Sequence, residues 1–135
     1  MSKQSANGSP RRALVAEDDG DMRALVVHAL EGEGFEVDDV ADGRRLWIQT
    51  LGAKVYDLVV TDMRLPVVDG LTVVEDLRAR EVHSPLIVMT AFSDESVRHR
   101  AARLGAVVLD KPFSMDELCA AARRLCQPAT RRGTP

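Results

Sequence analysis

The chain has 135 residues, of which 45% are hydrophobic and 29% charged, so one domain with an ordinary core fits it better than two domains or a disordered chain. Its formal net charge of -3 gives no support to a surface that binds nucleic acid directly. No apolar stretch approaches the length of a membrane span and the start, "MSKQSANGSPRR", has no hydrophobic signal segment, so we expect a cytoplasmic protein without membrane insertion.

The two ends of the chain differ in composition from its middle. Residues 1–10 are rich in Ser, Asn and Gly, and residues 127–135, "QPATRRGTP", have a similar character. We therefore expect two flexible tails around one folded domain over residues 11–126.

The first half of this domain alternates apolar runs with helical periodicity. Ala13–Ala16 is a continuous apolar run and predicts a strand, and Phe35–Val40 mixes apolar and acidic residues as edge strands do. "DGRRLWIQTLG" is typical of a short helix closed by Gly52. Between the two strands lies a predicted amphipathic helix whose buried face carries Met22, Leu25, Val26, Ala29 and Leu30.

Three further β–α units follow in the second half. Their expected strands are Tyr56–Thr61, Pro85–Thr90 and residues 106–109. Ser93 is the expected N-cap of the helix after the second of these strands, and Ser114 and Glu117 predict a capping box at the last helix. Cys119 and Cys126 fall within that helix, about 10 Å apart at its rise per residue, which is too far for a disulfide.

Five units of this kind predict an α/β fold. Strands without polar alternation, separated by amphipathic helices, are typical of a parallel sheet covered on both faces. Right-handed crossovers then produce a doubly wound sheet, and a binding site is expected at the carboxyl ends of its strands.

Acidic residues and a lysine collect at those carboxyl ends. The residues concerned are Glu17, Asp18, Asp19, Thr61, Asp62, Thr90, Asp110 and Lys111. Carboxylates that share a small space repel one another, and a divalent cation relieves the repulsion. Because the expected ligands are oxygen atoms, without His or Cys, Mg²⁺ is the favoured ion. A carboxylate nucleophile, a lysine charge and a threonine donor beside such an ion suit phosphoryl transfer.

Four segments resemble the receiver domain of two-component response regulators: "ALVAEDDGDMR", "DLVVTDMRLPVVDG", "LIVMTAF" and "LDKPFSMDEL". The resemblance runs in order from Ala13 to Cys126, and each motif falls at the end of an expected strand. It implies a five-stranded parallel sheet in the order 2-1-3-4-5, the flavodoxin-like arrangement of CheY-like domains. It also implies a phosphoprotein that uses Mg²⁺, with Mn²⁺ as an alternative.

The resemblance assigns roles to the matched residues. Asp62 would be the phosphoacceptor, Thr90 would bond the phosphoryl group, and Lys111, followed by a cis bond to Pro112, would contact the phosphoryl oxygens. Asp19 would be an extra carboxylate, and since acidic residues suit a helix N-terminus we expect it to cap the first helix. The implied metal ligands are Glu17 (through water), Asp18, Asp62 and the backbone carbonyl of Arg64.

Two departures from the family pattern bear on the expected switch. Val108 stands three positions before the lysine, where members usually have Tyr or Phe, and the segment from Gly105 to Lys111 is one residue shorter than common. We therefore expect phosphorylation to be read out by a route other than the usual threonine–aromatic relay. Arg64 and Phe92 are expected beside the acceptor, where they would influence how easily water reaches an acyl phosphate.

Three functions remain open at this point. The leading one is a switch that is phosphorylated by a sensor histidine kinase or phosphotransfer protein. Its output would pass to an effector protein or a homodimer through the face of the fourth helix, fifth strand and fifth helix, or to a module outside this chain. The second is a pseudo-receiver that binds partners without phosphorylation. The third is an aspartyl phosphatase, against which Arg64 stands, since such enzymes place a second aspartate there.

Overall fold

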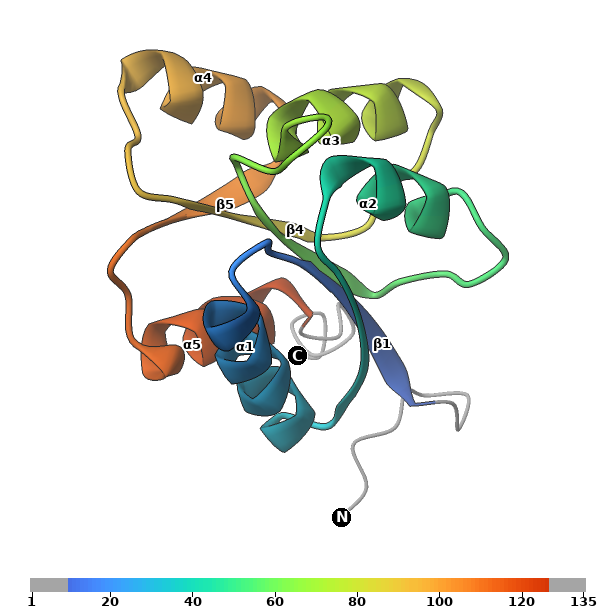
Figure 1. Cartoon of the computed structure of the whole chain (residues 1–135), viewed down its shortest axis with the longest axis vertical. Coiled ribbons are helices and arrows are strands. Elements are labelled where there is room, and N and C mark those ends of the chain that lie inside the picture. Colours follow the sequence, from blue (N-terminus) through green and yellow to red (C-terminus); the bar gives the residue numbers. More distant parts are fainter. Residues whose placement is uncertain (1–9, 127–135) are drawn as a thin grey trace, which may run out of the picture.

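Residues 10–126 form five parallel strands that alternate with five helices in a computed structural model (Figure 1). The strands are β1 (Arg11–Ala16), β2 (Phe35–Val40), β3 (Leu58–Asp62), β4 (Leu86–Thr90) and β5 (Ala106–Asp110). The helices are α1 (Gly20–Gly32), α2 (Gly43–Thr50), α3 (Gly70–Ala79), α4 (Glu95–Arg103) and α5 (Met115–Leu125). The expected tails lie outside the residues that the structure describes, apart from Pro10.

The sheet has the order β2-β1-β3-β4-β5, and every neighbouring pair is parallel. This confirms the predicted doubly wound sheet and its strand order, with Phe35–Val40 as an edge strand. The strand β3 begins at Leu58 rather than at the expected Tyr56, and it ends on Asp62. The register pairs Asp62 with Met89 of β4, so the carboxyl ends of the central strands lie at one edge.

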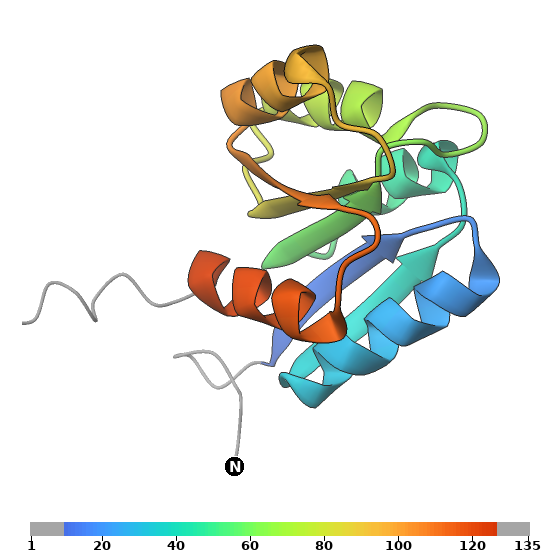
Figure 2. The same ribbon diagram turned by 90° about the vertical axis from the view of Figure 1, so that its left-hand side faces the viewer.

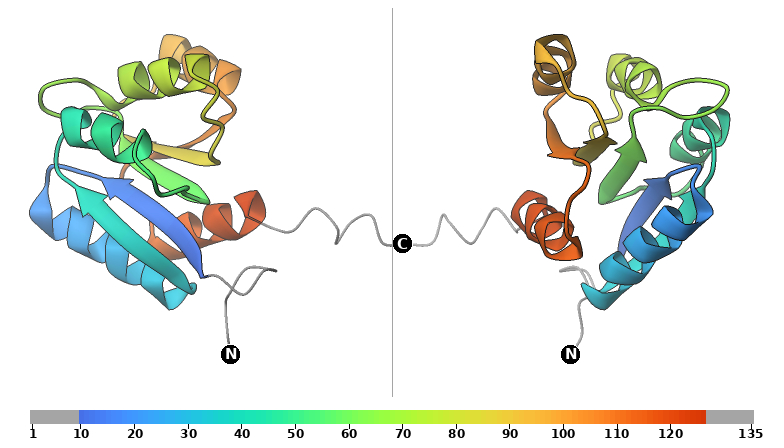
Figure 3. Two further views of the ribbon diagram at one scale, coloured as in Figure 1. Left: turned by 90° about the vertical axis from the view of Figure 1, so that its right-hand side faces the viewer. Right: turned by 60° about the vertical axis from the view of Figure 1, so that its left-hand side comes forward.

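Helices cover both faces of the sheet. Figures 2 and 3 show α1 and α5 packed on one face and α2, α3 and α4 on the other. The side chains of β1 alternate between two apolar cores: Val15 lies with Leu30 and Leu118 beneath α1 and α5, whereas Leu14 lies with Leu71 beneath the other three helices. Burial on both sides explains why β1, β3 and β4 have continuous apolar sequences.

The helix boundaries confirm most of the sequence predictions. Ser114 and Glu117 form the capping box of α5, and Asp19 caps α1 by accepting hydrogen bonds from Asp21 and Met22 N–H groups. The prediction that Ser93 caps the fourth helix is wrong: Asp94 is the N-cap of α4 and accepts from the Val97 N–H, whereas the Ser93 hydroxyl donates to Asp110.

The predicted buried stripe of α1 is also wrong at one position. Val26 and Leu30 are fully buried, but the Leu25 side chain is 54% exposed. Cys119 and Cys126 are free thiols, as their spacing indicated. Within residues 10–126, no helix combines the length and the apolar character that crossing a membrane requires.

Candidate functional site

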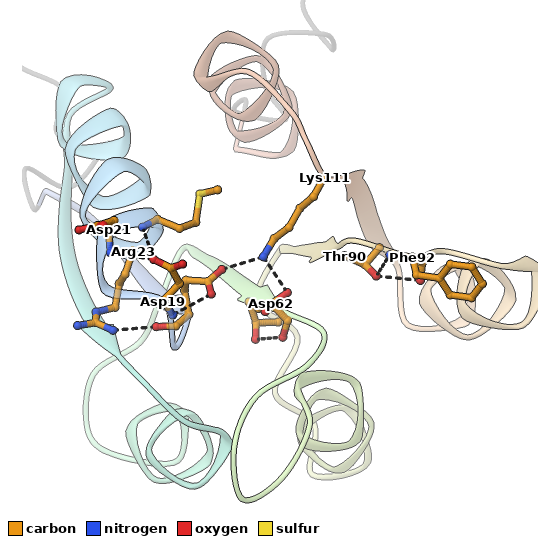
Figure 4. Close-up of polar contacts among 10 residues, drawn as sticks. Asp19, Asp21, Arg23, Asp62, Thr90, Phe92 and Lys111 are labelled. Atoms are coloured by element: carbon orange, nitrogen blue, oxygen red, sulfur yellow. Dashed lines mark hydrogen bonds and ion pairs between the residues drawn. The ribbon is translucent and has the colours of Figure 1, made fainter.

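The carboxyl ends of β1, β3 and β5 bring an acidic cluster and a lysine together (Figure 4). Glu17 and Asp18 follow β1, Asp62 is the last residue of β3, and Lys111 follows β5. One carboxylate oxygen each from Glu17, Asp18 and Asp62 lies within 4.8 Å of the other two. The fold therefore places three of the four predicted metal ligands in reach of a single ion.

The fold disfavours ionisation of the Asp62 carboxyl group. Only 8% of the residue is exposed. Its burial, together with the charges of Glu17 and Asp18 and against the opposing charge of Lys111, raises the pKa of Asp62 from 3.8 to about 6. A cation bound between these carboxylates would reverse this effect, so the electrostatics favour metal binding.

Lys111 joins the two buried carboxylates of the site. Its Nζ lies 3.2 Å from Glu17 Oε1 and 3.4 Å from Asp62 Oδ1. Burial lowers the pKa of the Lys111 ammonium, but the two carboxylates outweigh this and leave the pKa raised. The Lys111–Pro112 peptide bond is cis, as expected, and the Lys111 N–H donates to the Thr90 carbonyl at 2.7 Å. The ammonium is therefore charged, and it contacts the carboxylates of both Glu17 and Asp62.

Glu17 is held from several sides. It is 1% exposed, its Oε1 accepts from Lys111, and its Oε2 accepts from the Asp19 N–H at 3.1 Å. Its own N–H donates to the Val40 carbonyl of β2. Asp18, by contrast, is exposed. Glu17 is thus the fixed carboxylate of the cluster and Asp18 is its exposed one.

The loop between β3 and α3 is packed tightly behind Asp62. A Cβ atom on Gly70 would lie 2.3 Å from the Asp62 carbonyl oxygen and 2.8 Å from Thr61 Oγ1, so only glycine fits there. Arg64 is exposed in this loop, and no hydrogen bond reaches its carbonyl oxygen from residues 10–126. That oxygen is available as the fourth predicted ligand.

Thr90 is the last residue of β4, and its hydroxyl bonds to the backbone of Phe92 rather than to Asp62. The hydroxyl donates to the Phe92 carbonyl at 2.9 Å and accepts from the Phe92 N–H at 3.0 Å. The Phe92 side chain is 65% exposed, and Figure 4 shows its ring pointing away from Asp62. The structure therefore does not place the Phe92 ring beside the acceptor. Val108 pairs with Val88 in the sheet and is partly buried.

One contact beside the site could not be predicted from the sequence. Arg23 of α1 donates from Nη1 to the Glu17 carbonyl at 2.9 Å and from Nε to Asp39 of β2 at 2.9 Å. Arginines on exposed helix faces are common, and nothing in the spacing of Arg23 and Asp39 indicates that they meet. Only their positions on adjoining elements bring them together.

The donor set fits magnesium. Carboxylate oxygens and a free backbone carbonyl are hard ligands, and Mg²⁺ binds through one or two carboxylates while keeping several waters. The exposed position of Asp18 leaves room for those waters and for phosphate oxygens. Histidine and cysteine, which would favour zinc, are absent from this cluster.

Residues 13–123 match the family model of the response regulator receiver domain, so the chain belongs to this family. It is 42% identical over 125 residues to the transcriptional regulatory protein TcrA of Mycobacterium tuberculosis, covering 90% of this chain and 47% of TcrA. It is 34% identical to PdtaR of the same species, covering 81% of this chain and 53% of PdtaR. The chain thus spans about half the length of these curated relatives.

Solved structures show the same fold. The chemotaxis response regulator CheY4 of Vibrio cholerae has a TM-score of 0.77 and 26% identity, covering 85% of this chain and 98% of CheY4. The response regulator TrrA of Thermotoga maritima, in complex with Mg²⁺ and BeF, has a TM-score of 0.76 and 28% identity, covering 85% and 98%. The receiver domain of a Pseudomonas aeruginosa sensor histidine kinase has a TM-score of 0.77 and 28% identity, covering 89% and 100%, with magnesium coordinated in its active site cleft.

Proposed function

We propose that this chain accepts a phosphoryl group on Asp62 from a phosphohistidine of a histidine kinase or phosphotransfer protein. Family membership implies a histidine kinase as partner. The observation that carries the proposal is the position of Asp62 against Lys111, with oxygens of Glu17 and Asp18 within 4.8 Å. A carboxylate oxygen of Asp62 attacks phosphorus, a P–O bond forms, and the P–N bond breaks with its electron pair returning to the imidazole.

The residues of the chain supply alignment and charge for this step. Asp62 is held at the end of a buried strand, where its carboxylate has little freedom to turn away from the donor. Lys111 brings a positive charge to the phosphoryl oxygens. Asp18, Asp62 and the Arg64 carbonyl would hold Mg²⁺, with Glu17 acting through water. When bound, the ion neutralises charge that develops on the phosphoryl oxygens.

The hydroxyl of Thr90 is the proposed moving part. It now bonds to the backbone of Phe92, and a phosphoryl group on Asp62 would offer it a charged acceptor instead. That exchange would release the start of the β4–α4 loop and change the face formed by α4, β5 and α5. We propose this face as the surface that signals to an effector protein or to a second copy. Because Val108 stands at the position of the usual aromatic residue, the change in this face does not involve the movement of an aromatic side chain there.

Incubation with acetyl phosphate and Mg²⁺, followed by intact-mass measurement, tests the proposal. We expect a phosphate-sized mass gain in the wild type and in Asp116→Asn, which changes an exposed carboxylate on α5. Asp62→Asn and the omission of Mg²⁺ should each abolish the gain. An unmodified wild-type chain would contradict the proposal and favour a constitutive interaction module. Many turnovers of a small phosphate ester per chain would favour a phosphatase.

A further inference from the structure

Asp18 is the one carboxylate of the acidic cluster that no side chain or N–H group holds in place. Within residues 10–126, its carboxylate takes part in no hydrogen bond and no ion pair. The residue is exposed, so packing does not fix it either. Its place beside Glu17 and Asp62 must therefore come from the backbone on its two sides.

Both peptide groups that flank Asp18 are anchored by side chains. The carbonyl of the Glu17–Asp18 peptide accepts a hydrogen bond from Arg23 Nη1 at 2.9 Å, and the N–H of the Asp18–Asp19 peptide donates to Glu17 Oε2 at 3.1 Å. Since a peptide group is planar, fixing one atom on each side limits the two rotations that direct the Asp18 side chain. Arg23 therefore restrains the peptide group on the N-terminal side of Asp18.

Arg23 is in turn held by β2. Its Nε donates to Asp39 Oδ2 at 2.9 Å, and Asp39 pairs with Val15 in the register of β1 and β2. Figure 4 shows the guanidinium of Arg23 beside the start of α1, with a contact to the backbone that leads into the site. The planar guanidinium donates to both partners at once from separate nitrogens, which a lysine ammonium at this position would do less well.

We propose that Arg23 and Asp39 form a positioning pair that sets the place of Asp18 and thereby the affinity of the site for magnesium. This inference rests on the magnesium site of the proposed function. Neither residue is among the proposed ligands of the ion, and no hydrogen bond or ion pair joins either of them to Asp62. The pair acts through the Glu17–Asp18 peptide, as residues outside a metal site commonly do when they orient its ligands.

A purely structural role of the Arg23–Asp39 pair would change the stability of the fold, and a control ion pair separates this effect from a change in metal affinity. Arg23 and Asp39 form a partly exposed ion pair, and such pairs near the surface contribute little to stability. The pair Arg12–Glu36 also holds a residue of β2, but it joins β2 to β1 at 3.2 Å, at the opposite end of the sheet from the site. Arg12→Met is thus a matched control, because it removes an ion pair between β1 and β2 without reaching the backbone of Asp18.

The test is a titration of each purified chain with Mn²⁺, in which the electron paramagnetic resonance signal measures the concentration of free ion. Competition with Mg²⁺ then gives the affinity for Mg²⁺. We expect Arg23→Met to lower the affinity for both ions by about tenfold, which is the lower end of the effects seen when a residue that orients a metal ligand is replaced. Asp39→Asn should weaken binding less, and Arg12→Met should bind as the wild type does. Arg23→Lys should lie between Arg23→Met and the wild type, because it keeps one of the two bonds.

Two further measurements separate the outcomes. Thermal unfolding in EDTA should give Arg23→Met and Arg12→Met similar midpoints, which shows that the affinity change is not a loss of folding. With acetyl phosphate, Arg23→Met should need more Mg²⁺ for half-maximal phosphorylation yet reach nearly the wild-type rate at saturation. Wild-type affinity in both Arg23→Met and Asp39→Asn would overturn the inference, whereas a wild type that binds no ion would overturn the proposed function itself.

Discussion

At the scale of single residues, the site is built from charges whose environments differ. Asp62 is buried at the end of β3 and has a raised pKa, whereas Asp38 has a pKa below its ordinary value, because Tyr56 donates a hydrogen bond to it at 2.6 Å. The first carboxylate costs stability when it ionises, and the second contributes stability only when it is ionised. Opposite responses to pH follow for these two positions.

Asp62→Asn should stabilise the metal-free protein at pH 7. The folded protein holds the Asp62 proton more tightly than the unfolded chain does, so the wild type loses stability as pH rises from 3.8 to about 6. We expect a gain of about 1–2 kcal/mol at pH 7, reduced by the lost contact with Lys111. Urea unfolding in EDTA at several pH values measures it. A gain of equal size at pH 4 and pH 7 would show that ionisation is not the cause.

Tyr56→Phe should destabilise the protein by an amount that depends on pH. Tyr56 is buried, and its hydroxyl also accepts from Gln49 at 2.9 Å. Because the pKa of Asp38 is lowered, the stabilisation is present above pH 3.8 and is lost as pH falls through the folded pKa. We expect a loss of about 1 kcal/mol at pH 7. Urea unfolding at pH 7 and pH 3 measures it, and a larger loss at pH 3 would contradict the argument.

At the scale of elements, two loops connect the site around Asp62 with the surface. The β3–α3 loop is pinned at Gly70, whose N–H donates to the Met63 carbonyl at 2.7 Å. The β4–α4 loop is tied to the end of β5, because Asp110 accepts from the Ser93 hydroxyl and from Arg98 Nη2. The first loop is held by close backbone packing and the second by exposed polar contacts. They should therefore respond differently to substitution.

Gly70→Ala should destabilise the domain and disturb the acceptor together. The added Cβ would meet backbone atoms of Asp62 that cannot move aside without shifting the end of β3. We expect a loss of about 2–4 kcal/mol, typical of forced overpacking, and slower phosphorylation by acetyl phosphate. Gly32→Ala is the control, because nothing lies within 4 Å of a Cβ there. Equal stability of the two variants would contradict the packing argument.

Asp110→Asn should loosen the β4–α4 loop without unfolding the domain. The substitution weakens the contacts to Ser93 and Arg98 at an exposed position, so the global effect should be small. Hydrogen exchange of residues 91–95 should quicken by about threefold, which corresponds to losing one exposed ion pair. Glu75→Gln, which weakens the Arg100 pair outside this loop, should leave that exchange unchanged. Unchanged exchange in Asp110→Asn would show that the contact does not restrain the loop.

At the scale of the whole molecule, the site joins segments that are far apart in the chain. Lys111 and Glu17 are separated by 94 positions in sequence, and their contact spans the sheet from β5 to β1. An ion held by Asp18 and Asp62 would add a link between β1 and β3 that exists only in the folded state. Metal binding and folding should therefore be coupled.

Mg²⁺ should stabilise the domain by mass action. At ten times its dissociation constant, the ion is expected to raise the free energy of unfolding by about 1.4 kcal/mol. Thermal unfolding with increasing MgCl₂ measures this, with EDTA as the metal-free reference. Asp18→Asn should remove most of the effect and Asp116→Asn none of it. A midpoint that does not move with MgCl₂ in the wild type would argue against a magnesium site at these residues.

The sequence by itself determined the layered fold and the place of the site. Continuous apolar strands and amphipathic helices can bury their faces only as a parallel sheet covered on both sides, and polar residues after the strands must then meet at one edge. Glu17, Asp62 and Lys111 are predicted to share a site for this reason. Asp19 and Ser114 are predicted as caps because a cap acts on neighbouring backbone.

Only the tertiary structure decided the contacts that depend on the orientation of neighbouring elements. Periodicity placed Leu25 on the buried face of α1, but it is exposed in the structure of residues 10–126. Local spacing made Ser93 a cap, but Asp110 of β5 binds its hydroxyl. Two hydrogen bonds likewise depend on loop and helix placement: the one from the Thr90 hydroxyl to the Phe92 carbonyl and the one from Arg23 to the Glu17 carbonyl. Local pattern records which residues are apolar or polar, whereas side-chain partners across elements are set by packing.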